Sequence, residues 1–131
     1  MSAIATSSAR VVALLLVLSV ALAAPVTAAT LVRSRVSVHL APGGTAAYLY
    51  GVVRSGRDAC VAGRSVTLQV SPTGTDGWLN ADTTTTNGDG TWTLWAGVGE
   101  IGNGYYRVVA ARRNAGGLDC RRAVSPVLFV D

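Results

Sequence analysis

The sequence predicts an all-β protein, a sandwich of about seven antiparallel strands with one disulfide bond. Three observations support this prediction. Apolar and polar residues alternate in short runs, and glycine-rich breaks recur about every ten residues. Beyond the first 29 residues, no segment shows the 3.6-residue apolar period of an amphipathic helix. Short alternating runs between turn signals are typical of two packed antiparallel sheets.

The first part of the chain, residues 1–29, has the pattern of a secretory signal peptide. A single basic residue, Arg10, precedes the continuous apolar run Val11–Ala24, and small residues follow that run. A membrane anchor is the alternative. However, the apolar run Val11–Ala24, of about 14 residues, would span only ~21 Å as a helix, which is shorter than the ~30 Å hydrocarbon core of a bilayer. We therefore expect cleavage after Ala28 or Ala29, and no membrane span in the cleaved protein.

The remaining residues, 30–131, are enough for one domain of about 100 residues. They contain two cysteines, Cys60 and Cys120, and the oxidising compartment outside the cell favours a bond between them. Such a bond would close a loop of about 60 residues, which the chain-entropy model values at roughly 4 kcal/mol. One histidine and the lack of a CxxC motif argue against a zinc site, and we expect no metal and no cofactor.

The predicted strands are recognised by alternating apolar residues, or by richness in threonine in the case of the fourth. In chain order they are Arg35–Leu40, Ala47–Arg54, Ser65–Ser71, Trp78–Thr86, Thr91–Val98, Tyr105–Arg112 and Val124–Val130. One alternate set in each apolar run is expected to face the core. These residues are Val36, Val38, Leu40, Leu49, Gly51, Val53, Val66, Leu68, Val70, Trp92, Leu94, Ala96, Tyr106, Val108, Ala110, Leu128 and Val130.

Each run ends at residues that favour a turn. The breaks are Pro42–Gly44, Ser55–Asp58, Pro72, Asn87–Gly90, Gly102–Gly104 and Asn114–Asp119. The strongest is Asn87–Gly90, where Asn and Gly accept the positive φ of a tight hairpin. Asn114–Asp119 is expected to be a loop that leads to the second cysteine.

Four segments carry a resemblance to a known family. They are Leu49–Val53, Val66–Leu68, Thr86–Trp92 and Gly104–Val108. Together they resemble the carboxypeptidase regulatory-like or transthyretin-like (prealbumin-like) β-sandwich domains, most closely the small exported actinobacterial type. The resemblance covers roughly residues 36–130 and implies an immunoglobulin-like, prealbumin-like sandwich that is a noncatalytic module. The hormone-carrying and ureide-hydrolysing relatives of transthyretin use several histidines, whereas this chain contains only His39.

No catalytic constellation is evident, so we expect no enzyme activity. His39 belongs to the polar face of the first run, and the chain has no Gly-x-Ser-x-Gly motif for a nucleophile. Segment Thr85–Gly90 half-resembles a calcium loop but lacks the first aspartate and the late glutamate, so a hairpin turn is the expected structure. The carboxylates are scattered rather than paired: Asp58, Asp76, Asp82, Asp89, Glu100, Asp119 and Asp131.

Trp78 and Trp95 are candidate binding aromatics. Trp92 alternates with Leu94 toward the core, which places Trp95 on the opposite face. Exposed tryptophans beside polar residues can stack on a sugar or anchor a protein partner. The alternative is that loops or the outer face of a sheet cover them.

All eleven basic residues are arginine, and the formal charge of +4 becomes +3 without Arg10. This mild excess does not by itself imply nucleic acid. Six arginines flank the two cysteines and would converge on one pole: Arg57, Arg64, Arg112, Arg113, Arg121 and Arg122. Such a pole could hold an anionic polymer of the cell wall, such as teichoic acid, or phospholipid headgroups. The alternative is a set of solvated loops that keep the protein soluble.

The sequence therefore predicts a secreted, extracellular, noncatalytic module with a binding or structural role at the cell surface or in the medium. Its partner would be a cell-wall anionic polymer, a carbohydrate or another secreted protein, and not nucleic acid. A small secreted inhibitor or carrier is the alternative, with Thr73–Gly77 or Val98–Asn103 as the exposed loop. A hydrolytic enzyme is the third and weakest hypothesis.

Overall fold

The computed structural model of the protein describes residues 28–43, 46–96 and 102–131. Nearly all of the predicted signal peptide, and most of the loop Val98–Asn103, lie outside these residues. In this described part of the chain, one 3-10 turn, η1 (Asp58–Cys60), accompanies the strands. The strands are β1 (Thr30–Val32), β2 (Ser34–Val36), β3 (His39–Gly43), β4 (Ala46–Ser55), β5 (Ser65–Ser71), β6 (Leu79–Thr85), β7 (Thr91–Ala96), β8 (Gly104–Ala110), β9 (Arg113–Ala115), β10 (Leu118–Cys120), β11 (Ala123–Val124) and β12 (Leu128–Val130).

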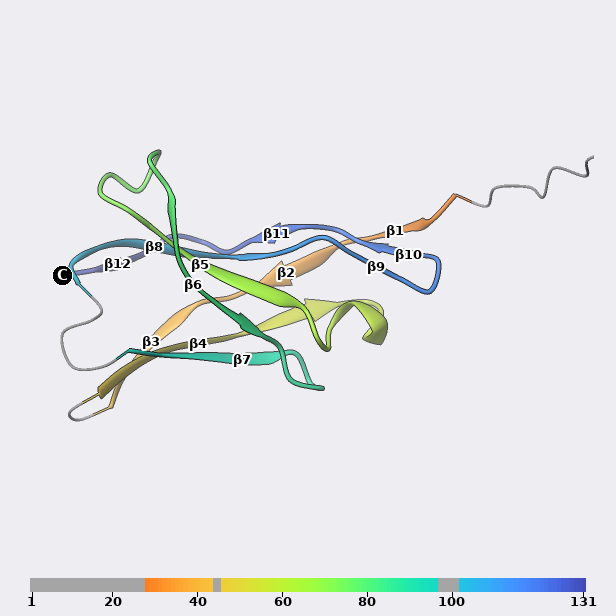
Figure 1. The fold of residues 1–131 in the computed structure, drawn as a ribbon, viewed down its shortest axis with the longest axis horizontal. Helices are drawn as coiled ribbons and strands as arrows, with labels where there is room; N and C mark the ends of the chain where they lie inside the picture. Colours follow the sequence, from red (N-terminus) through yellow and green to blue (C-terminus); the bar gives the residue numbers. More distant parts are fainter. Residues whose placement is uncertain (1–27, 44–45, 97–101) are drawn as a thin grey trace, which may run out of the picture.

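Two antiparallel sheets form the body of the protein, as the alternating runs predict. One has five strands in the order β11-β8-β5-β6, and β12 also pairs with β8. The other has four strands: β2 and β3 lie end to end along one edge of β4, and β7 pairs with its other edge. Strands β8, β11 and β12 lie above β3, β4 and β7 in Figure 1, which shows the two layers edge-on.

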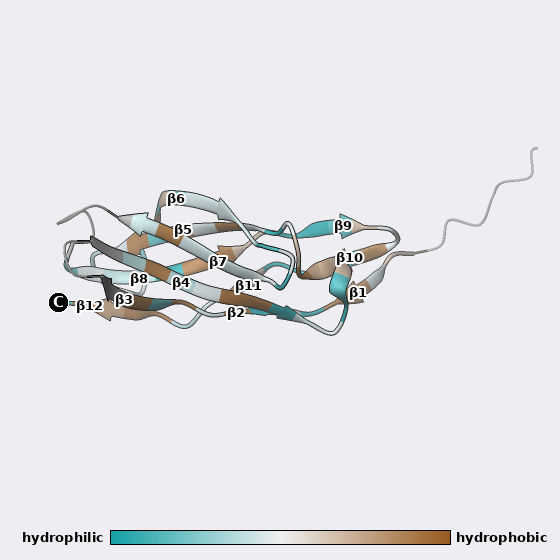
Figure 2. Ribbon diagram, turned by 90° about the horizontal axis from the view of Figure 1, so that it is seen from below, coloured by the Kyte–Doolittle hydropathy of each residue, from teal (hydrophilic) through white to brown (hydrophobic). Residues whose placement is uncertain are grey.

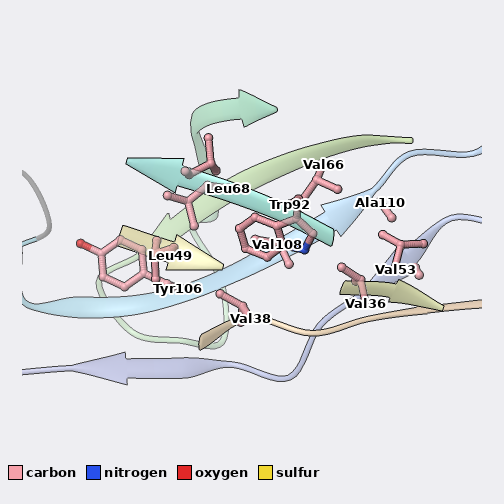
Figure 3. Packing of buried hydrophobic residues seen from close by; sticks show 12 residues of the cluster. Val36, Val38, Leu49, Val53, Val66, Leu68, Trp92, Tyr106, Val108 and Ala110 are labelled. Carbon is pink, nitrogen blue, oxygen red and sulfur yellow. The ribbon is translucent and has the colours of Figure 1, made fainter. Parts of the chain in front are cut away.

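Side chains from both sheets meet in one hydrophobic core. Its buried members are Val36, Val38, Leu49, Val53, Val66, Leu68, Trp92, Leu94, Tyr106, Val108, Ala110 and Ala123. Trp92 is only 1% exposed and lies among these side chains in Figure 3. Nearly all of these residues are on the face that the sequence predicts to point inward, and the predicted all-β sandwich is confirmed. Figure 2 shows the resulting change between hydrophobic and hydrophilic residues along β4.

Gly51 is required where β4 passes close to the bend between β2 and β3. A Cβ atom at this position would lie 1.9 Å from the carbonyl oxygen of Ser37 and 2.9 Å from the ring of Trp92. The Ser37 amide donates to the Val52 carbonyl, and the Ser37 hydroxyl accepts from the Val52 amide. This irregular pairing interrupts the edge, so the single predicted strand Arg35–Leu40 is two strands in the structure.

The last predicted strand, Val124–Val130, is also divided in two. The hydroxyl of Ser125 accepts a hydrogen bond from the Val108 amide, and the Ser125 amide donates to the Val108 carbonyl. Pro126 follows and has no amide hydrogen to continue the ladder. The edge of the five-stranded sheet therefore consists of β11 and β12 with a break between them.

A third, small sheet was not expected from the sequence. Its order is β1-β10-β9, and β1 pairs with β10 in parallel. Asn114–Asp119, predicted to be a loop, belongs to the β9–β10 hairpin, which turns at Gly116 and Gly117 with φ of 54° and 82°. In Figure 1 this sheet extends beyond the sandwich at the end opposite the C-terminus.

The disulfide bond between Cys60 and Cys120 is present and joins η1 to β10. Both cysteines are fully buried, and they pack with Val32, Ala115 and Leu118 in a second small hydrophobic cluster. The bond closes a loop of 60 residues, for which the chain-entropy model gives roughly 4 kcal/mol. It therefore fastens the small sheet to the end of the sandwich.

Candidate functional site

The disulfide gathers the six predicted arginines at one end of the molecule, but they have different environments. Arg64 does not belong to an exposed pole, because its side chain is fully buried. Its guanidinium donates to the carbonyl oxygens of Cys60 (2.8 Å), Ala111 (2.8 Å) and Arg121 (3.0 Å), and to the hydroxyl of Ser34 (2.9 Å). Arg64 is thus a structural residue, and its inclusion in a surface site was wrong.

The burial of Arg64 has a clear physical basis. A guanidinium carries five N–H donors in a fixed plane, so one side chain can satisfy several backbone carbonyls that converge from different directions. Burial, together with the nearby Arg113, lowers the pKa of Arg64 from its ordinary value. Its backbone is also held, because the Arg64 amide donates to the Thr86 hydroxyl, which in turn donates to the Val61 carbonyl.

Two further arginines of the predicted pole are engaged within the protein. Arg112 makes a bidentate pair with Asp119, with Nε to Oδ1 and Nη2 to Oδ2 both at 2.7 Å. The hydrogen bonds from Arg112, and the charges of Arg112 and Arg121, lower the pKa of Asp119, and the same pair raises the pKa of Arg112. Arg113 donates to the carbonyl of Ala62. These side chains stabilise the β9–β10 hairpin.

Exposed positive charge gathers in a region that we call the arginine groove, which includes Arg121 and Arg122 of the predicted pole. Five exposed arginines line it: Arg33, Arg35, Arg54, Arg121 and Arg122. It consists of three adjoining hollows of about 590, 410 and 300 Å³, which share several of these residues. The largest lies where β2 and β4 face β11, and Ser34, Ser37 and Pro126 also line it. Arg57, the remaining member of the predicted pole, is exposed just before η1.

Sequence reasoning missed Arg33, Arg35 and Arg54, although a signal for two of them was present. Arg35 and Arg54 alternate with the buried residues Val36 and Val53, which places both on the outer face. The pairing of β2 with β4 then sets Arg35 directly opposite Arg54. Like charges opposite each other across two strands destabilise a sheet. Among the residues that the structure describes, the only ion pair is Arg112–Asp119, so none of the five groove arginines is neutralised in this way.

The two candidate tryptophans lie on different sheets and do not form one site. Trp78, just before β6, is half-buried, and the guanidinium carbon of Arg107 lies 4.2 Å from the centre of its ring. Arg107 also donates to Gln69 (2.7 Å), which donates to Asn80 (3.0 Å). This network covers the outer face of the five-stranded sheet, so Trp78 is engaged in a cation–π contact within the protein.

Trp95 is 68% exposed and belongs to a series of neighbouring rings, tilted against one another, that we call the aromatic row. The row runs from Trp95 on β7 across Tyr48 and Tyr50 on β4 to His39 on β3. The ring centres are 4.6 Å apart for Trp95 and Tyr48, 5.8 Å for the two tyrosines, and 5.3 Å for Tyr50 and His39. Sequence reasoning missed the two tyrosines, although their alternation with the inward Leu49 and Gly51 could have revealed them. His39 is exposed, as expected.

One loop proposed for an inhibitor, Thr73–Gly77, is held in a defined conformation. The buried hydroxyl of Ser71 accepts from the amides of Thr73 (3.2 Å) and Gly74 (2.9 Å) and donates to the carbonyl of Asp76. The Thr73 hydroxyl also donates to the Asp76 carboxylate (2.7 Å). The tip of the loop is therefore exposed, and its backbone is held by hydrogen bonds to the buried hydroxyl of Ser71.

In residues 28–43, 46–96 and 102–131, no three His, Cys, Asp or Glu side chains gather closely enough to hold a metal ion. The same residues include no helix with the length and apolar character needed to cross a membrane. Comparisons with protein-family models, with curated proteins and with solved structures found no match to this chain. The resemblance to carboxypeptidase regulatory-like domains therefore stays a prediction.

Arg64→Met tests the structural role of the buried arginine. The substitution keeps an unbranched side chain but leaves the carbonyls of Cys60, Ala111 and Arg121 without their donor, so we expect the free energy of unfolding to fall by about 3 kcal/mol or more. Urea unfolding of the oxidised protein measures the change. Arg57→Met is the matched control at an exposed position and should leave unfolding almost unchanged. Equal effects of the two substitutions would contradict this role of Arg64.

Asp119→Asn tests the ion pair through its pH dependence. Because the folded pKa of Asp119 lies below its ordinary value of 3.8, the pair stabilises the protein above that pH and loses its effect as the pH falls through the folded pKa. We therefore expect the variant to have a lower Tm than the wild type at pH 7, and the two curves to converge below about pH 3.8. Asp58→Asn, at an exposed position, is the control and should leave the Tm at pH 7 almost unchanged. If the Tm difference between Asp119→Asn and the wild type were the same at every pH, the ion pair would not stabilise the protein in the proposed way.

Proposed function

We propose that this chain is a secreted, noncatalytic β-sandwich module that binds an anionic polymer, at the cell surface or in the medium, through the arginine groove. Export is supported by the signal-like residues 1–29 and by the buried disulfide, a type of bond that persists in oxidising compartments. The sandwich itself would be of the immunoglobulin-like, prealbumin-like kind that the sequence resembles. A noncatalytic role is supported by His39, whose exposed ring lies in a tilted contact with the ring of Tyr50.

The observation that carries the proposal is the direct opposition of Arg35 and Arg54 beside Arg122. An arrangement that costs stability and is not relieved by a described carboxylate is expected where the charges serve an external anion. Arginine presents paired donors that match the oxygens of carboxylates and phosphates. Because β2 and β4 hold these two arginines on a sheet, they are positioned before a ligand arrives.

Arg35→Gln/Arg54→Gln tests the groove. Binding of fluorescent polyphosphate and of fluorescent polygalacturonate is measured by anisotropy across a salt series. We expect the double variant to lose at least about tenfold affinity for both polymers at low salt, and the wild type to lose its affinity steeply as salt screens the charges. Arg107→Gln removes a charge from the other sheet and should change binding by less than about twofold. Failure of the wild type to bind either polymer at low salt would refute the proposed function.

A small secreted inhibitor or carrier is the second candidate, favoured by the ordered loop Thr73–Gly77. Protease inhibitors commonly present a backbone that is already in its bound conformation, and the hydrogen bonds of Ser71 provide such an arrangement here. A panel of extracellular proteases and glycosidases measures this directly. We expect any inhibition to disappear in Ser71→Ala while polymer binding persists, and the absence of inhibition across the panel would remove this candidate.

A further inference from the structure

Two arginines of the arginine groove, Arg35 and Arg54, share the outer face of the four-stranded sheet with the aromatic row. Successive side chains of a strand point to opposite faces. Since Leu49 and Val53 are buried, Tyr48, Tyr50, Val52 and Arg54 all point outward from β4. The outer face of this strand thus changes from aromatic to cationic along its length.

The neighbouring strands repeat this change. On β3, His39 lies opposite Tyr50 of β4, and on β7, Trp95 lies opposite Tyr48 of β4. These residues complete the aromatic end of the surface. Thr93 and Thr91 follow on β7 and add hydroxyl groups in the middle. Tyr48 and Arg54 are six residues apart, so the surface extends over about 20 Å of β4, the length of a short oligosaccharide.

We propose that the anionic polymer is an acidic polysaccharide, whose neutral sugar rings stack on the aromatic row while its acidic groups pair with Arg35 and Arg54. This inference rests on the proposed function and specifies its ligand. The C–H face of a pyranose ring is apolar and packs on an aromatic ring, and its rim of hydroxyls can hydrogen-bond to Thr93 and the tyrosines. A polymer with acidic groups on only some of its sugars matches a surface on which rings and charges are separated.

The separation of rings and charges also argues against two other polymers. Single-stranded nucleic acid carries a phosphate at every base, so its binding surfaces place cations alongside the stacking aromatics. Here Val52 and the threonines separate Tyr50 from Arg54, which are about 13 Å apart along β4. Polyphosphate has no apolar face and would contact only the arginine groove. The aromatic row would then have no ligand to cover it.

The test uses the oxidised protein and four fluorescent probes: half-esterified polygalacturonate, fully esterified polygalacturonate, polyphosphate and oligothymidylate. Half-esterification leaves neutral and acidic sugars in one chain, and full esterification removes the charge from the same rings. We expect the half-esterified polymer to bind most tightly. Tyr48→Ala/Trp95→Ala should weaken that binding by at least about tenfold and change polyphosphate binding by less than about twofold.

Control variants separate the two ends of the surface. Phe129→Ala removes an exposed aromatic from the other sheet, where it stacks on Tyr105, and should leave all four affinities unchanged. If Tyr48→Ala/Trp95→Ala unfolds, binding of the four probes is measured with Trp95→Ala alone, because this position is 68% exposed. Arg35→Gln/Arg54→Gln should weaken binding of every charged probe.

Three outcomes would overturn the inference. Unchanged binding of half-esterified polygalacturonate to the aromatic variants would exclude stacking, while polyphosphate binding would leave the proposed function intact. Oligothymidylate that binds more tightly than the polysaccharide, and loses affinity in Tyr48→Ala/Trp95→Ala, would identify the ligand as single-stranded nucleic acid. Equal affinities for the half-esterified and fully esterified polymers would show that the arginines take no part.

Discussion

The buried guanidinium of Arg64 is the interaction on which the end of the protein that carries the arginine groove depends. It joins backbone from η1, from the segment after β8 and from the segment after β10, and it holds the hydroxyl of Ser34 on β2. Ser34 separates Arg33 from Arg35, and the Arg121 carbonyl that Arg64 binds immediately precedes Arg122. One buried arginine therefore fixes the backbone that carries four of the five exposed arginines of the groove.

The disulfide and the Arg112–Asp119 pair act on the same end of the molecule. The bond between Cys60 and Cys120 holds η1 against β10, and the ion pair holds β10 against the segment that enters β9. An uncompensated charge such as that of Arg64 is costly to bury, and it is tolerated only where the surrounding carbonyls are already positioned. The covalent link supplies that positioning, so the sulfur bridge and the buried arginine support one another.

The sandwich could be predicted from the sequence because alternation with a period of two is a local property. It places Leu49 and Val53 inside and separates the buried Trp92 from the exposed Trp95 without knowledge of any partner strand. The small sheet could not be predicted in this way. Its strands have three residues each, too few to show alternation, and β1 pairs with β10 across most of the chain.

The surface proposed for binding is formed by pairing between strands, and linear spacing along the chain gave a misleading grouping of its residues. Proximity to the cysteines joined Arg64 and Arg112 to a surface pole, although one is buried and the other is paired with a carboxylate. Arg35 and Arg54 are distant in sequence and become neighbours only through the register of β2 on β4. Once that register is known, the alternation of β4 alone leads from Arg54 to Tyr50 and Tyr48.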